Sequence, residues 1–320
     1  MDLVDALIAK HRDRPDVHLT RVLGAFVVVA GGAIVEVDRT HALKSCPLQS
    51  LLSTASIEDY VQEKMERFGH FTSARELVRD DIAVPFGASE MMRAALQAGS
   101  IDCAITVCDG AGTVIADAPD VVQGIGARMN GLFYTSPIPE VLSQLRARGC
   151  TVFDDAAIDQ VRGLKTAAAV GHQRIAVTVN VRYGASFAAL EACAQEAGVS
   201  VVVLGICATG ATEARAREAV EGSDLAWSCA SGPLRCLSDR ARLQITHGIP
   251  IFVYTQTGLD FIADYADEAG AKTLRGLDPD RHYLLATGTG ETPVTLGKRR
   301  LYLQESTLPV PGRNAPEPLE

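Results

Sequence analysis

Apolar runs that alternate with helix patterns constrain the fold of this chain most strongly. The run SVVVLGI at Ser200–Ile206 is apolar at nearly every position, which is typical of a parallel strand covered on both faces. Similar strands are predicted at Ile101–Cys108 and Arg174–Val179, with helices between them. Strands that alternate with helices favour a parallel sheet between two helix layers. We therefore predict an α/β fold whose mostly parallel sheet is covered by helices on both faces.

The N-terminal and C-terminal regions do not show this alternation of strands and helices. Val22–Val37 predicts a β-hairpin around Gly31 and Gly32. Helices are predicted from Ser56 to Gly69 and over residues 89–97. We expect a hairpin and helical region at 1–99, an α/β domain at 100–304, and a disordered proline-rich tail at 305–320. Further helices are predicted at 139–148, 158–170, 185–197, 212–220, 234–240 and 259–268, and further strands at 151–153, 224–228 and 250–254.

Composition narrows the class of protein. With 320 residues, 47% apolar content and a net charge of -9, the chain has the composition of an acidic globular protein. No Lys/Arg cluster with interleaved aromatic residues is present in the sequence, which disfavours nucleic-acid binding. No apolar run approaches the roughly 20 residues of a membrane span, and the charged N-terminus lacks a signal-peptide core. We expect a cytoplasmic protein, and the sequence leaves open whether it forms a homo-oligomer.

The eight cysteines are spaced widely along the chain. In a cytoplasmic protein they are expected to be thiols or metal ligands rather than disulfides. No CxxC pair occurs, so any metal site must be assembled by the fold. Cys103, Cys193 and Cys207 fall within strand or helix patterns, and we predict that they are core residues.

The strongest local motif follows the strand at Ile101–Cys108. Asp109 stands directly after this strand, and the following glycines allow a tight turn that exposes backbone amides. Ligands collect at such strand ends in α/β sheets. We predict a site here, with Asp109 as a base or orienting carboxylate and with Gly110, Gly112 and Thr113 as substrate contacts; an ordinary strand-to-loop turn is the alternative.

Several phrases of the sequence together resemble one known family. The phrases are SCPLQ at 45–49, FGHFTSAR at 68–75, FGASE at 86–90, VCDGAGTVI at 107–115, VQGIGARMNGLFYTSPIPEV at 122–141 and SCAS at 228–231. The likeness spans roughly residues 20–300 and is to the methanogenesis marker protein 8 family, also catalogued as a domain of unknown function. The resemblance implies an association with methane metabolism, whose characteristic small thiol is coenzyme M.

Three cysteines lie inside the family-like phrases. Cys46, Cys108 and Cys229 are each predicted at a loop or strand end. Three thiolates that converge from separate segments can hold a [4Fe-4S] cluster with one iron open to substrate or sulfide. The alternatives are three unrelated buried cysteines or one nucleophilic thiol, Cys108.

The second glycine cluster offers an anion site. Gly124, Gly126, Arg128 and Asn130 can cradle a phosphate or sulfonate through backbone amides and a guanidinium group. The spacing differs from the dinucleotide fingerprint, so a Rossmann cofactor is disfavoured. A structural glycine turn is the alternative.

Three further polar residues complete the predicted site. His70 and Glu90 are candidates for acid-base catalysis, and Arg75 is a candidate for anion contacts. A surface histidine without a role is the alternative for His70.

These residues lead to one main functional hypothesis and two alternatives. The main hypothesis is an enzyme of small-thiol metabolism that performs sulfur transfer or thiol formation on a small sulfonate, in coenzyme M biosynthesis, with a sulfur or electron donor as partner. The first alternative is a non-catalytic cofactor-binding or assembly factor for a methane-type C1 pathway. The second is a metal-free enzyme with a cysteine nucleophile.

Overall fold

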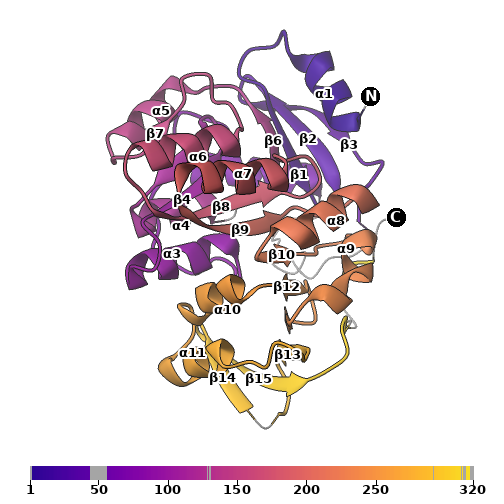
Figure 1. Cartoon of the computed structure of the whole chain (residues 1–320). Helices are drawn as coiled ribbons and strands as arrows, with labels where there is room; N and C mark the ends of the chain where they lie inside the picture. Colours follow the sequence, from indigo (N-terminus) through magenta and orange to yellow (C-terminus); the bar gives the residue numbers. More distant parts are fainter. Residues whose placement is uncertain are drawn as a thin grey trace.

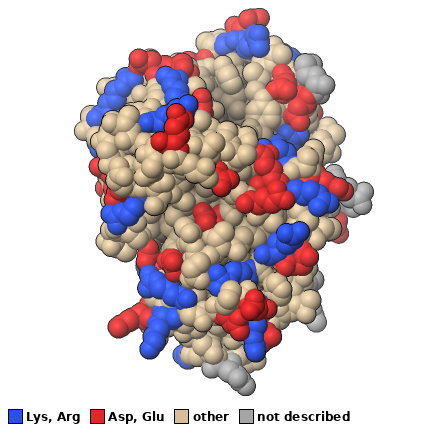
Figure 2. Space-filling view, in the orientation of Figure 1, with Lys and Arg blue, Asp and Glu red and all other residues tan. Residues whose placement is uncertain are grey.

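The computed structural model describes residues 2–43, 56–127, 129, 131–290, 292–310, 312 and 315–317. It confirms the α/β class, because a large mixed sheet lies between two layers of helices (Figure 1). A smaller sheet near the N-terminus packs beside it. On the face shown in Figure 2, lysines and arginines are interspersed with acidic residues rather than gathered into one basic patch.

Four parallel strands form the centre of the large sheet. Their order is β4-β8-β9-β10, and each pairs in parallel with its neighbour. All four therefore end at the same edge of the sheet, where α/β proteins bind ligands. Their bounds are β4 Cys103–Cys108, β8 Arg174–Asn180, β9 Ser200–Ile206 and β10 Leu225–Trp227.

Outside this centre the sheet is mixed, which corrects the prediction of a mostly parallel sheet. β12 pairs antiparallel with both β10 and β11, and only β11 with β13 adds another parallel pair. The short Thr246–Pro250 turn joins β11 to β12, and a parallel connection requires a much longer crossover. The remaining strands are β5 Gly112–Ala116, β7 Thr151–Val152, β11 Leu243–Ile245, β12 Ile251–Val253, β13 Tyr283–Ala286, β14 Thr292–Leu296 and β15 Arg299–Glu305.

Two apolar layers cover the large sheet. Along β4, Ala104 and Cys108 pack with one layer, and Cys103 and Ile105 pack with the other, as strand alternation requires. The first layer contains α3 Ala88–Ala98, α4 Pro119–Gly126, α5 Pro139–Arg146, α10 Gln256–Ala263 and α11 Glu268–Arg275. The second contains α6 Gln160–Ala169, α7 Phe187–Ala197, α8 Glu213–Gly222 and α9 Gly232–Cys236.

The small sheet has the order β3-β2-β1-β6. The predicted hairpin is confirmed, and Gly31 and Gly32 both take positive φ angles in its turn. Helices α1 and α2 cover opposite faces of this sheet, and α2 has the predicted Ser56 and Gly69 caps. The bounds are β1 His18–Val22, β2 Ala25–Ala30, β3 Ala33–Asp38, β6 Gly131–Thr135, α1 Leu3–His11 and α2 Ile57–Phe68.

The C-terminal part differs from the sequence prediction in two details. The single helix predicted at 259–268 is two helices, α10 and α11. Strands β13, β14 and β15 follow them, and the sequence patterns do not predict these strands. Among the described residues of the predicted tail, Leu308 packs on Phe252, and Val310 exchanges two hydrogen bonds with Gln244.

The β4–β5 hairpin generates a test of the fold at Gly112. Gly112 has φ +63°, and a Cβ there would lie 2.0 Å from the carbonyl oxygen of Ala156. Gly99 has φ +69°, and a Cβ there would meet nothing within 4 Å, so it is the matched control. We expect Gly99→Ala to cost about 1–2 kcal/mol of left-handed strain. Gly112→Ala should lower the free energy of unfolding, measured in urea, by several kcal/mol more than Gly99→Ala does. An equal loss in the two variants would contradict the close approach of the Ala156 carbonyl to Gly112.

Candidate active site

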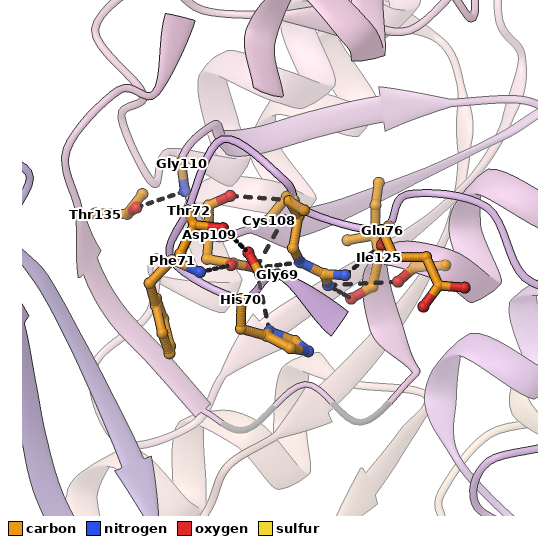
Figure 3. Close-up of polar contacts among 12 residues, drawn as sticks. Gly69, His70, Phe71, Thr72, Glu76, Cys108, Asp109, Gly110, Ile125 and Thr135 are labelled. Carbon is orange, nitrogen blue, oxygen red and sulfur yellow. Dashed lines mark hydrogen bonds and ion pairs between the residues drawn. The ribbon is translucent and has the colours of Figure 1, made fainter. Parts of the chain in front are cut away.

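Asp109 lies directly after β4 and is fully buried. Its Oδ2 accepts a hydrogen bond from the backbone N–H of Phe71 at 2.6 Å, and its Oδ1 accepts one from Nε of Arg75 at 2.8 Å. Figure 3 shows Asp109 at the centre of a cluster that also includes His70 and Phe71. The structure therefore brings together three predicted site residues, Asp109, His70 and Arg75, from two distant segments.

Arg75 is the counter-charge of this cluster. Its guanidinium group is buried and also donates to the backbone carbonyls of Glu76 and Ile125, the latter at 3.0 Å. Burial alone would raise the pKa of Asp109, but the charge of Arg75 and its hydrogen bond hold that pKa well below its ordinary value. Because its donors are bound by protein groups, Arg75 anchors Asp109, and its predicted anion-binding role stays a prediction.

His70 has a different environment on each ring nitrogen. Its Nδ1 lies 3.6 Å from Oδ1 of Asp109, and no described residue hydrogen-bonds to its buried Nε2. The ring lines a small cavity together with Lys64 and Met129. Burial, and then the positive charge of Arg75, lower the pKa of His70 to about 4, so the ring is neutral at pH 7.

The other residues predicted near Asp109 hold the loops of this region together. The N–H of Gly110 donates to Oγ1 of Thr135 at 2.7 Å, and Oγ1 of Thr113 accepts from the N–H of Asp159 at 2.8 Å. Gly112 closes the β4–β5 hairpin. The Cys108 thiol is fully buried, and burial raises its pKa above the ordinary value.

The second glycine cluster lies partly in a helix. Gly124 and Gly126 are in the last turns of α4. A Cβ at Gly124 would lie 2.2 Å from the carbonyl oxygen of Leu77, and one at Gly126 would lie 2.4 Å from Cβ of Ser89. Close packing thus requires both glycines. Arg128 and Asn130 lie outside the described residues, so the predicted anion cradle stays a prediction.

Glu90 lies on α3 and is buried. Its Oε1 accepts hydrogen bonds from the backbone N–H groups of Ala83 and Val84 at 3.0 and 2.9 Å, and from Nε2 of Gln123 at 3.0 Å. These contacts fix the segment before α3 to α4. Its predicted acid-base role stays a prediction.

Two cysteines lie in the same neighbourhood at the carboxyl ends of β9 and β10. In the parallel register Leu204 lies opposite Leu225, and Gly205 lies opposite Ala226. The register brings Cys207, directly after β9, close to Cys229, beyond the end of β10, and each affects the charge environment of Arg21. Cys207 and Cys229 have φ angles of +58° and +46°, a conformation that concentrates at functional sites in non-glycine residues.

Arg21 completes what we call the thiol–arginine site, defined as Arg21, Cys207 and Cys229. Arg21 reaches it from β1 and donates to the backbone carbonyls of Gly24, at 3.0 Å, and Thr209. It is only 7% exposed, and in the described part of the chain it forms no ion pair with a carboxylate. Burial, and then the charge of Arg182, lower its pKa to about 10, and burial raises the pKa of Cys207 to about 12.

Sequence reasoning misses two members of this site. It places Cys207 in the core because an apolar strand precedes that residue, and it does not single out Arg21. The available signal is the position of Cys207 directly after a two-sided apolar strand and shortly before Gly210.

The described residues test the predicted iron–sulfur cluster only in part. Cys108 packs among Asp109, Arg75 and Cys150, whereas Cys229 lies with Cys207 and Arg21. Within the described ranges, no three His, Cys, Asp or Glu side chains are arranged to hold a metal ion. Cys46 lies outside those ranges, so a three-cysteine cluster stays a prediction, and we derive no chemical step through it.

The fold and the site define a mixed α/β protein with a paired-thiol site at the carboxyl ends of parallel strands. The chain belongs to the family described as "Uncharacterized protein conserved in archaea (DUF2099)", whose model matches residues 18–267. It is similar to an uncharacterized protein of Methanocaldococcus jannaschii, with 34% identity over 264 residues that cover 79% of this chain and 92% of that protein. No solved structure matches the chain. None of its described helices is long and apolar enough to cross a membrane.

The buried histidines generate a prediction for stability against pH. The folded-state pKa values of His70 and His18 are both about 4, below the unfolded value of roughly 6.5. The unfolded state therefore binds more protons between these values, and stability falls as the pH drops from 6.5 toward 4. We expect each histidine to lower the free energy of unfolding by about 2 kcal/mol between pH 7 and pH 5. Urea unfolding at the two pH values measures this change.

A matched pair of variants shows whether His70 causes its share of this loss of stability. His70→Gln should reduce the difference in unfolding free energy between pH 7 and pH 5. His172→Gln, which lies at the end of α6, should leave the difference unchanged. A His70→Gln protein with the full wild-type difference would show that His70 is not held neutral.

Proposed function

We propose that the chain is an enzyme of small-thiol metabolism and that the thiol–arginine site is its reaction centre. The observation that supports this proposal is the convergence of Cys207, Cys229 and a buried arginine without a carboxylate partner among the described residues. The convergence lies at the carboxyl ends of β9 and β10, the edge at which α/β sheets bind ligands.

The two thiols supply the reactive atoms in this proposal. Burial raises the pKa of Cys207 to about 12, so its thiol is neutral at rest. Arg21 favours the thiolate once a proton leaves, because the thiolate and the guanidinium group carry opposite charges. A thiolate can add to the carbonyl carbon of an aldehyde, whose oxygen then takes a proton. Two neighbouring thiols can also be oxidised to a disulfide, which supplies two electrons and two protons to the substrate, and an external two-electron reductant then restores both thiols.

The family-like phrases favour a substrate of the coenzyme M type. In this finer proposal the enzyme belongs to the methanogenesis marker protein 8 family and acts in coenzyme M biosynthesis on a small sulfonate. Conversion of the aldehyde sulfoacetaldehyde to the corresponding thiol consumes hydrogen sulfide, two electrons and two protons and releases one water molecule. A sulfide source and a two-electron reductant must therefore act as partners.

An iron–sulfur version and a metal-free version of this enzyme differ in the role of the cysteines. In the first, Cys46, Cys108 and Cys229 hold a [4Fe-4S] cluster that binds sulfide. In the second, the Cys207 and Cys229 thiols react directly. The pairing of Cys207 with Cys229 favours the second version, because Cys108 has other neighbours.

The first test is thiol formation by anaerobically purified protein. Sulfoacetaldehyde, sulfide and reduced methyl viologen are supplied, and the thiol product is measured by mass spectrometry. We expect Cys207→Ala and Cys229→Ala each to lower turnover by about a thousandfold or more, as loss of a reacting group does. Cys236→Ala is the control, because Cys236 is an exposed thiol at the end of α9. Full turnover in both site variants would contradict the proposal.

Iron and acid-labile sulfide in the same preparations separate the two versions. We expect turnover without stoichiometric iron, since Cys229 neighbours Cys207 whereas Cys108 has other neighbours. Near four iron and four sulfide per chain, lost in Cys46→Ala, Cys108→Ala and Cys229→Ala, would instead establish the cluster. Folded protein with neither turnover nor thiol reactivity would favour an assembly factor.

A further inference from the structure

We propose that Arg21 and Arg182 form an anion site beside Gly210 that binds the sulfonate or carboxylate group of a small substrate. This inference deepens the proposed function and rests on it for identifying the bound anion as substrate. The residues of this site come from β1 and from the segments after β8 and β9, whereas the cradle predicted from the sequence is assigned to Gly124, Gly126, Arg128 and Asn130.

The two guanidinium groups converge on one point. A Cβ added to Gly210 would lie 3.4 Å from one terminal nitrogen of Arg21 (Nη2) and 3.5 Å from Nε of Arg182. The actual residue is glycine with φ +69°, so no side chain of residue 210 lies between the two donors. Both guanidinium carbons also lie over the ring of Phe26, at 5.0 Å for Arg21 and 5.4 Å for Arg182. Phe26 thus supports both cations from one side.

The charges around this point do not balance. Arg182 pairs with Asp2 through two contacts of 3.1 and 3.3 Å. Arg21 is more deeply buried, and its Nε and other terminal nitrogen donate only to backbone carbonyls. A buried charge is costly unless an opposite charge compensates it. Among the described groups in these contacts, two are guanidinium groups and one is a carboxylate, which favours an anionic ligand. A further carboxylate, that of Asp5, accepts a hydrogen bond from the Tyr183 hydroxyl.

The Cys207 thiol does not supply the missing negative charge. Burial raises the pKa of Cys207 to about 12, so this thiol carries no charge at pH 7. A bound anion would supply this counter-charge. Sulfonate and carboxylate groups present two or more oxygens to guanidinium donors and carry one negative charge. An anion held here would place the rest of a small substrate near Cys207 and Cys229.

Gly210→Ala tests this geometry with a matched control. The added methyl group would fill the space between Arg21 and Arg182 at ordinary van der Waals distance, so the fold should tolerate it. Gly198 also has a left-handed backbone, φ +66°, with nothing within 4 Å of its Cβ position. Gly198→Ala therefore carries the same backbone strain without touching the proposed site.

Isothermal titration calorimetry on the full chain measures binding of ethanesulfonate and propionate, with sulfate and the neutral ethyl methyl sulfone as comparisons. We expect the two singly charged anions to bind wild type and Gly198→Ala equally. Gly210→Ala should weaken their binding by about tenfold or more, and Arg21→Gln by more than that. The neutral sulfone should show no heat of binding.

Several results would overturn this inference. They are absence of binding by both anions, equal binding by the neutral sulfone, tighter binding of doubly charged sulfate, and full affinity in Gly210→Ala. A Cys207→Ala, Cys229→Ala double variant separates this inference from the proposed function. It should bind ethanesulfonate with wild-type affinity while it loses turnover. If the protein binds neither anion but its turnover still requires Cys207 and Cys229, only the anion site is refuted. If it binds the anions but its turnover does not require these thiols, only the proposed function is refuted.

Discussion

The parallel register of β9 against β10 is the constraint on which the candidate site depends. Leu204 and Leu225 lie opposite each other, so the two strands end at the same level and their following loops meet. The loops are then fixed to each other, because Oγ1 of Thr209 accepts a hydrogen bond from the N–H of Ala230 at 3.2 Å. A shift of one residue in this register would separate the two thiols and remove this bond.

The small sheet adds the charged part of the site. Arg21 lies on β1 opposite Gly131 of β6, and a Cβ at Gly131 would lie 3.0 Å from Sγ of Cys207. A glycine at this position therefore lets the small sheet approach the strand ends of the large one. On the other face of β1, Thr20 lines the cavity beside His70. The two clusters thus lie on opposite faces of one strand.

Local patterns in the sequence predict much of the fold. Helix α2 is bounded by a serine and a glycine whose capping roles depend only on near neighbours, and the Gly31-Gly32 turn defines its hairpin in the same way. The structure brings Asp109 together with His70 and Arg75, whereas Glu90 contacts other segments, and the predicted roles of all four residues stay predictions. Arg21 could not be predicted, because its contact with Thr209 joins residues 188 positions apart. The antiparallel direction of β12 is not predicted either, because its short connection to β11 sets that direction and the sequence patterns do not predict β11 as a strand.

Bridging of Cys207 and Cys229 by phenylarsine oxide tests the paired-thiol site most directly, since trivalent arsenic forms a stable adduct with two neighbouring thiols. Intact-mass spectrometry of folded, reduced protein counts the adducts. One bridged adduct in wild type and in Cys236→Ala, absent from both Cys207→Ala and Cys229→Ala, is the expected result. A bridged adduct that persists in either site variant, or none in wild type, would contradict the pairing of these thiols.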